Sequence, residues 1–500
     1  MNRLAFGSMP IDPRTPVLVG AGQVLQRAEG LDDARDPVAL MVEAIRDAAS
    51  DAGLTSVPAP DALRVVNLLS WRYGNPARLI ADDLGLSPRE TGYSSMGGNT
   101  PQTLVNSAAR EIAAGDINLV VLAGGETTRT RSRWRKAGRE PEWRTSSEEP
   151  VLVSEDLVMN MPEEIARDIV MPIQIYPMFE TALRARAGRG IDEHQRHLGE
   201  LWSRFSAVAA RNPHAWIRRE YTADEIRTTG TDNRMVGFPY PKLMNSNNDV
   251  DMAAALIVCS AGRAEALGIP RDRWVFIHSG SDAHEHPFVS HREHFWRTPA
   301  IELAGRRVLE LAGIGIGDVS VVDLYSCFPS AVQLGAASLG LDLDGQLTRT
   351  GGLPFAGGPW NNYVMHAIAT VMSDLRARPG EWGLVWANGG YTTKHAFGVY
   401  STEPPAAGFR HDHPQNEIDA LPRRSLASPA DAAGPATVEA YSVMHDRSGA
   451  PERVIASCLL ADGRRAWGDS RDASLGREMC TREWVGASVT LDADGVLHAD

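Results

Sequence analysis

The sequence predicts an α/β protein with two similar halves, followed by a small β-rich domain. Strand-like apolar segments alternate with helix-like segments through the first 400 residues, a pattern typical of sheets covered by helices. Several short motifs of the first half recur in the same order in the second. Near the C-terminus, short alternating segments are separated by hairpin signals. Each of these observations is justified below in chain order.

The first half opens with an apolar strand over residues 16–20 and a helix that starts at Pro37. Asp36 is a residue type that caps helices, and proline is favoured at the first helical position. A second helix is expected over 100–114. The apolar run 117–125 has the character of a strand buried on both faces. This alternation of strands and helices predicts parallel pairing.

The second half repeats this plan. One helix ends at Ala-Gly-Leu 52–54, and its counterpart ends at Ala-Gly-Ile 312–314. A Gly-Gly pair precedes a long helix in each half, at 97–98 and at 357–358. Chance similarity between α/β segments is the alternative explanation. The shared order of the matches favours a true repeat.

Three further segments complete the predicted organisation. A charged and aromatic insertion interrupts the first half, and a proline- and alanine-rich stretch follows the second, as in linkers. Hairpin signals at Ser448-Gly449, Asp462-Gly463 and Asp494-Gly495 then predict a β-domain. The predicted domains are 1–268 with an insertion at about 127–241, 269–402, a linker at 403–435, and a β-rich domain at 436–500.

Composition excludes several classes of protein. The net charge is −13, which argues against nucleic acid as a partner. No apolar run reaches the roughly 18 residues of a membrane span. The first ten residues lack the pattern of a secretory signal, so a cytoplasmic location is expected. Four scattered cysteines have no metal-site spacing, and no metal is expected.

Three segments resemble thiolases, most closely the sterol-carrier-protein type. They are 113–125, the Arg-Asn-Pro-His-Ala of 211–215, and 251–256, where Met252 replaces a glycine of the family. The β-rich C-terminus is similar to the additional domain of the thiolase-like proteins of type 1. The chain is thereby identified as a member of the thiolase superfamily, and the resemblance implies the layered αβαβα thiolase fold.

The resemblance also implies thiolase chemistry, but the main catalytic residues of thiolases are missing from this sequence. Thiolases act on coenzyme A (CoA) thioesters through a cysteine at a helix N-terminus, a histidine that activates it, and a second cysteine. The corresponding positions here are Gly98, Gly358 and Ala387. Tyr325 stands where the family has asparagine or histidine. The active site is therefore expected to be degenerate, and ordinary thiolysis is not expected.

Tyr325, Tyr391 and His395 remain as candidate catalytic residues near the expected pocket. A tyrosine can act as a general acid or base when its surroundings tune its pKa. Thiolase-fold aldolases that shorten steroid side chains are similar, because they use tyrosines and need a small β-barrel partner. The fused β-domain is expected to play a comparable part. The alternative is that these side chains only pack and hydrogen-bond.

Two groups of residues are candidates for ligand binding. Gly97, Gly98, Gly357 and Gly358 would expose backbone N–H groups at helix starts, although tight turns explain them equally. By resemblance, Arg133 and Trp134 lie where thiolases hold the CoA nucleotide, and such side chains bind phosphate and stack on adenine. A solvated, charge-balanced segment is the alternative.

These observations predict a thiolase-like protein of the acetyl-CoA acetyltransferase family by fold, which binds CoA or acyl-CoA as ligand and has no covalently bound cofactor. The alternatives are an aldolase-type lyase acting on β-hydroxyacyl-CoA, a non-catalytic lipid-thioester-binding protein, and a partner of another thiolase-like subunit. By resemblance, lipid metabolism is the expected context. A monomer or a homodimer is expected, since thiolases pair through the sheet edge near the first catalytic loop.

Overall fold

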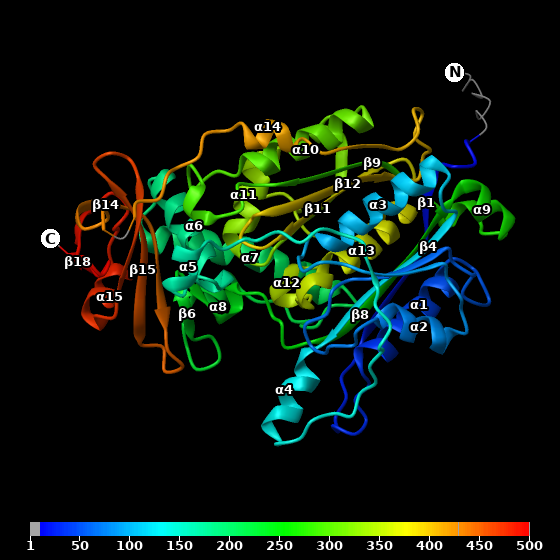
Figure 1. The fold of residues 1–500 in the computed structure, drawn as a ribbon, viewed down its shortest axis with the longest axis horizontal. Helices are drawn as coiled ribbons and strands as arrows, with labels where there is room; N and C mark the ends of the chain where they lie inside the picture. Colours follow the sequence, from blue (N-terminus) through cyan, green and yellow to red (C-terminus); the bar gives the residue numbers. More distant parts are fainter. Residues whose placement is uncertain (1–10, 429, 500) are drawn as a thin grey trace.

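The computed structural model describes residues 11–428 and 430–499 (Figure 1). The first ten residues, on which the expectation of no secretory signal rests, lie outside this range. Within it, no helix is long and apolar enough to cross a membrane.

The first half forms one side of a large mixed sheet. Its strands lie in the order β1 (Pro16–Leu25), β8 (Asp251–Ser260), β4 (Leu119–Thr127), β2 (Ala62–Val65) and β3 (Glu90–Tyr93). The last three pair in parallel, as predicted. However, β8 runs antiparallel to both of its neighbours. The expectation of purely parallel pairing is wrong here because β8 follows the long insertion and returns between β1 and β4.

The second half has the same plan. Its strands lie in the order β9 (Val275–His284), β12 (Lys394–Ser401), β11 (Trp382–Gly389) and β10 (Val319–Leu324). Strand β12 is antiparallel to both neighbours, and β10 pairs with β11 in parallel. A short antiparallel contact between β1 and β9 joins the two halves. The predicted internal repeat is therefore confirmed.

Helices cover and separate the two sheet regions in five layers, α–β–α–β–α. The middle layer consists of α3 (Thr100–Ala114) and α13 (Tyr363–Ala377), which contact strands of both halves (Figure 1). One outer layer contains α1 (Pro37–Asp51) and α2 (Pro76–Leu84). The other contains α10 (Pro299–Ala312) and α11 (Pro329–Leu339).

The start of α1 shows how local sequence positions a helix. The Asp36 carboxylate accepts a hydrogen bond from the Ala39 amide at 2.9 Å, which satisfies one of the free amides of the first turn. The Tyr73 hydroxyl donates to the other carboxylate oxygen at 2.8 Å. The predicted cap is confirmed, and it also ties α1 to the loop before α2.

The regular elements of the insertion are mostly helices. Its elements are α4 (Thr128–Lys136), β5 (Val151–Leu152), α5 (Pro162–Ala166), α6 (Pro172–Arg186), α7 (Ile191–Arg211), α8 (Ala223–Arg227), β6 (Met235–Phe238) and β7 (Tyr240–Pro241). Strand β5 pairs in parallel with the outer edge of β3. The insertion thus covers the sheet edge nearest the start of α3.

The C-terminal domain is a second sheet. It contains β14 (Gly434–His445), β15 (Pro451–Leu460), β16 (Arg465–Ser470), α15 (Ala473–Met479), β17 (Ser488–Leu491) and β18 (Leu497–Ala499). Gly449, Gly463 and Gly495 lie in the three predicted hairpin turns with φ of 87°, 84° and 78°, a region that favours glycine. The insertion joins this sheet, because β6 pairs with β14.

The segment 403–435 contains more structure than a linker composition predicts. Strand β13 (Arg410–Asp412) pairs with β9, and α14 (Gln415–Asp419) follows it. The Gln415 side chain accepts a hydrogen bond from the His284 amide at 2.9 Å. The remaining short elements are α9 (Ala261–Ala266), α12 (Gly352–Phe355) and 3₁₀ turns at Lys242–Met244, Arg271–Arg273, Val289–His291, Ile316–Asp318 and Trp360–Asn362.

Candidate functional site

The start of α3 brings together the predicted nucleophile position and Tyr325. A Cβ atom placed on Gly98 would lie 2.4 Å from the Tyr325 hydroxyl oxygen and 2.5 Å from the Asn388 carbonyl oxygen. Tyr325 follows β10 directly, and its amide donates to the Trp386 carbonyl in β11 at 3.1 Å. The tyrosine hydroxyl therefore occupies the space that a side chain at position 98 would need.

The Tyr325 side chain is 7% exposed. Its hydroxyl has no hydrogen-bond partner among residues 11–428 and 430–499, and the same holds for the Gly98 amide. Burial, reinforced by the nearby Cys327, raises the pKa of Tyr325 well above its usual value. The hydroxyl is therefore protonated at neutral pH. Two hydrogen-bond donors without partners thus lie at the N-terminus of α3.

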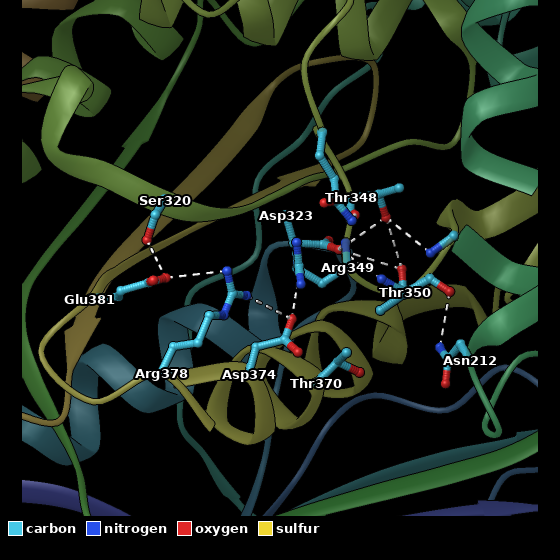
Figure 2. A network of polar contacts seen from close by, with 12 residues as sticks. Asn212, Ser320, Asp323, Thr348, Arg349, Thr350, Thr370, Asp374, Arg378 and Glu381 are labelled. Atoms are coloured by element: carbon cyan, nitrogen blue, oxygen red, sulfur yellow. Dashed lines mark hydrogen bonds and ion pairs between the residues drawn. The ribbon is translucent and has the colours of Figure 1, made fainter. Parts of the chain in front are cut away.

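A buried carboxylate holds the strand end that carries Tyr325. Asp323 is 1% exposed. It accepts hydrogen bonds from the amides of Arg349 (2.8 Å) and Thr350 (3.3 Å) and from the Thr348 hydroxyl (3.1 Å) (Figure 2). The Tyr363 hydroxyl also donates to it at 3.2 Å. Burial raises the pKa of Asp323 to about 6. The Tyr363 ring packs edge-on against Tyr325, with centroids 5.6 Å apart. Asp323 thus positions Tyr325 indirectly, through Tyr363 and the end of β10.

Polar contacts continue from this carboxylate to the surface. Arg349 pairs with Asp374, which also pairs with Arg378 at 3.8 Å, and Arg378 reaches Glu381 at 3.2 Å (Figure 2). Glu381 in turn accepts from the Ser320 hydroxyl at 2.7 Å. These contacts connect α13 to the loop at Arg349 and to the start of β10 at Ser320.

The predicted histidine position is also filled by its neighbours. A Cβ atom on Gly358 would lie 2.3 Å from the Ser246 hydroxyl oxygen and 2.9 Å from Asn248 Oδ1. A Cβ atom on Gly357 would lie 2.5 Å from the Met252 sulfur. Met252 is the residue that replaces a glycine of the family, so its side chain uses space next to this turn.

The other predicted anion-binding amides are mostly occupied. The Gly97 amide donates to Asn361 Oδ1 at 3.0 Å, and the Gly358 amide donates to the Asn247 carbonyl at 2.9 Å. Ala387 is fully buried in β11 and paired with Ala396. Of the four predicted glycines, Gly98 and Gly357 therefore have amides without a hydrogen-bond partner in the described ranges, and Gly98 is the one beside Tyr325.

Tyr391 and His395 make no hydrogen bond with Tyr325. The Tyr391 hydroxyl donates instead to the insertion, with Asn160 Oδ1 at 3.1 Å and the Val170 carbonyl as acceptors. The His395 Nδ1 accepts from the Trp386 indole at 3.3 Å. Burial, and secondly Arg292, lower the pKa of His395 to about 3. The imidazole is neutral at neutral pH, and the three residues do not form one hydrogen-bonded group.

Arg133 and Trp134 lie on α4, which projects from the body of the protein away from α3 (Figure 1). The Arg133 guanidinium already donates to the carbonyls of Ala28, at 2.6 Å, and Glu29. The Arg139 guanidinium covers the Trp134 ring at 4.3 Å. These contacts match the charge-balanced alternative more closely than a free nucleotide site.

Three cavities have volumes of about 440, 330 and 330 Å³. The first lies beside the start of α3 and includes His395, but none of the three is lined by Tyr325 or Tyr391. In the described ranges, no group of three or more histidine, cysteine or acidic residues is placed to hold a metal ion. Ser246 and Asn248, which fill the space at Gly358, match no motif in the sequence, whereas Met252 is a visible departure from the family.

Comparisons with known proteins agree with the fold. Residues 414–496 match a sequence family described as "Thiolase-like protein type 1 additional C-terminal domain". The crystal structure of a monomeric SCP2-thiolase like protein type 1 from Mycobacterium smegmatis is similar over 98% of this chain and 100% of that one. It has 31% identity and a TM-score of 0.85.

Two more distant proteins are also similar. The benzoylsuccinyl-CoA thiolase subunit BbsB of Thauera aromatica is 29% identical over 133 residues, which are 27% of this chain and 32% of that relative. A structure described as the Ltp2-ChsH2(DUF35) aldolase shares the fold over 78% of this chain and 98% of that one, with 19% identity and a TM-score of 0.57. Together with the fold and the additional domain, these findings show that the chain belongs to the thiolase-like proteins of type 1.

Proposed function

We propose that this protein binds CoA thioesters without forming an acyl-enzyme. The observation that carries the proposal is the position of the Tyr325 hydroxyl, 2.4 Å from where the Cβ of a nucleophile on Gly98 would lie. The position holds a protonated hydroxyl instead of a thiolate. Such a group can hold an acyl carbonyl, but it is a poor nucleophile.

The same position supports recognition of a carbonyl oxygen. The Tyr325 hydroxyl and the Gly98 amide are both donors without partners in the described ranges. They lie at the N-terminus of the 15-residue helix α3, where the helix dipole favours negative charge. Paired donors at such a place stabilise partial charge on an oxygen atom. The thioester carbonyl supplies the missing acceptor.

Calorimetric titration with acetyl-CoA tests this role of Tyr325. We expect Tyr325→Phe to weaken binding about fivefold, because it removes one hydrogen bond worth about 1 kcal/mol. Tyr391→Phe is the matched control. Its hydroxyl donates to Asn160 and Val170, so its loss should leave the affinity unchanged. Equal affinities for wild type and Tyr325→Phe, or a loss confined to Tyr391→Phe, would contradict the assignment.

A second candidate function is retro-aldol cleavage of a β-hydroxyacyl thioester. The free hydroxyl of Tyr325 favours it, since a general acid or base must be able to reach its substrate. The similarity in fold to the Ltp2-ChsH2(DUF35) aldolase is consistent with it, and the docked C-terminal domain would take the place of a separate partner. Tyr391 does not support it, because its hydroxyl is engaged by the insertion.

An assay with a β-hydroxyacyl-CoA distinguishes the two functions. The turnover is measured through the carbonyl product that is released. If the protein is a lyase, Tyr325→Phe should lower kcat by about a hundredfold, the usual contribution of general acid–base catalysis. If the protein only binds thioesters, neither the wild type nor Tyr325→Phe forms a carbonyl product. Cleavage at the same rate in both variants would exclude Tyr325 from the chemistry.

A further inference from the structure

Lysine is rare in this chain. The sequence has 50 lysine and arginine residues, and only Lys136, Lys242 and Lys394 are lysines. Lys136 and Lys242 are exposed, whereas Lys394 is only 6% exposed. Arginine supplies the positive charge almost everywhere else, but its guanidinium stays protonated and cannot act as a nucleophile. A buried lysine therefore offers a chemistry that the many arginines do not.

The surroundings of Lys394 favour a neutral amine. Its Nζ donates to the Met96 carbonyl, and no carboxylate in the described ranges lies within ion-pair distance. An ammonium group would have three donors and no counter-ion here, which is costly in a buried place. Burial lowers the pKa of Lys394, and the charge of Asp156 offsets only part of this effect.

Lys394 lines the cavity of about 440 Å³. The cavity lies between the segment 153–157 of the insertion, the polar side of α3, and the ends of β9 and β12. Its volume is within the range of small-molecule sites.

A buried acceptor without a partner accompanies the amine. Asn99 Oδ1 has no hydrogen-bond partner in the described ranges. It and the Lys394 Nζ lie 2.4 Å and 3.0 Å from the position that a Cβ on Gly97 would take. The next residue, His395, faces the opposite side of β12, where its Nδ1 accepts from the Trp386 indole. The site thus holds an amine and a free acceptor.

The acidic residues of the cavity do not neutralise this amine. Asp282 is the buried one, and its carboxylate already accepts hydrogen bonds from Thr103 (2.6 Å) and Asn106 (2.8 Å) and lies 2.8 Å from His411 Nε2. Glu155 and Asp156 are exposed. Their charges are therefore screened by water.

We propose that Lys394 is the reactive amine of this cavity and that the cavity takes a small aldehyde or ketone. The Lys394 nitrogen adds to the carbonyl carbon and forms a carbinolamine. One amine proton passes to the carbonyl oxygen during addition, and Asn99 Oδ1 accepts from the hydroxyl group so formed. Loss of one water molecule, with both amine protons leaving the nitrogen, gives an imine that hydrolysis reverses. This site is separate from the thioester site proposed above and does not depend on it.

Reductive trapping tests the proposal on the full chain. The protein is incubated at pH 7 with propanal, and separately with acetone, in the presence of sodium cyanoborohydride. Peptide mass spectrometry then follows alkylation of all three lysines. We expect Lys394 to react severalfold faster than Lys136 and Lys242, because a lowered pKa leaves a larger fraction of free amine at pH 7. The exposed lysines act as internal controls in the same sample.

Two variants sharpen the test. Lys394→Arg keeps a cation and should remove the fast adduct while the two exposed lysines react as before. Asn99→Ala should slow the reaction of Lys394 and leave the exposed lysines unchanged, because it removes the acceptor for the carbinolamine hydroxyl. Circular dichroism establishes that both variants are folded. Reaction of Lys394 no faster than that of the exposed lysines, or no reaction of Lys394 at all, would overturn the proposal.

Discussion

Replacing Gly98 by cysteine is expected to destabilise the protein and still not produce an acyl-enzyme. The new Cβ would lie 2.4 Å from the Tyr325 hydroxyl oxygen and 2.5 Å from the Asn388 carbonyl oxygen. The second contact is with the backbone of β11, which is held by its pairing with the neighbouring strands. It therefore cannot move away as a flexible side chain could. Overpacking of this kind costs about 1–3 kcal/mol. Urea unfolding and intact-mass analysis after incubation with acetyl-CoA measure the two effects.

Gly317→Cys is a matched control for this substitution. Gly317 is exposed, and no atom lies within 4 Å of a Cβ placed there. It should therefore be tolerated with little change in stability. A Gly98→Cys protein that is as stable as this control and becomes acetylated at the new thiol would contradict the expected steric conflict with Tyr325.

Arg465→Ala is expected to cost about 3–5 kcal/mol of stability, the usual range when one partner of a buried ion pair is removed. Arg465 is fully buried between the C-terminal domain and the thiolase-like core. It pairs with Glu439 at 2.8 Å. It also donates to the carbonyls of Val289 (3.2 Å), Ser290 (2.8 Å) and Arg292 (2.6 Å). The substitution leaves all of these acceptors without their donor.

The adjacent Arg464 provides the control, because it pairs with Asp431 and Asp462 at the surface. Exposed pairs contribute little, so Arg464→Ala should unfold at nearly the wild-type urea concentration. We further expect Arg465→Ala to unfold in two steps, with the C-terminal domain first. A single transition at the wild-type midpoint would show that this arginine does not hold the domains together.

Local features of the fold were predictable from the sequence, and non-local pairing was not. The Asp36 cap and the glycines at 449, 463 and 495 depend on neighbouring residues, so they could be identified from short motifs. The antiparallel course of β8 depends on where the chain returns after a long insertion. The structure within 403–435 depends on contacts with β9, such as that of Gln415 with His284, which a proline-rich composition conceals.

The candidate site likewise contains features that the sequence predicts and features that it does not. The motif around Tyr325 indicated its place after a strand, and the structure brings it to Gly98. The filling of the pocket by Ser246, Asn248 and Met252 could not be predicted, because these residues approach from a distant loop and strand. The direction of Tyr391 depends on the insertion, and no motif describes it. Lys394 was visible as one of three lysines, but its burial was not.

Thioester binding without acylation can be measured by calorimetric titration of the unmodified protein with CoA, acetyl-CoA and longer acyl-CoA thioesters, with the intact mass recorded afterwards. We expect at least one thioester to bind with a Kd of about micromolar, roughly 8 kcal/mol, and the protein mass to stay unchanged. Absence of binding across the series would contradict thioester recognition. A mass increase equal to the acyl group would contradict the assignment of Tyr325 as the occupant of the nucleophile position.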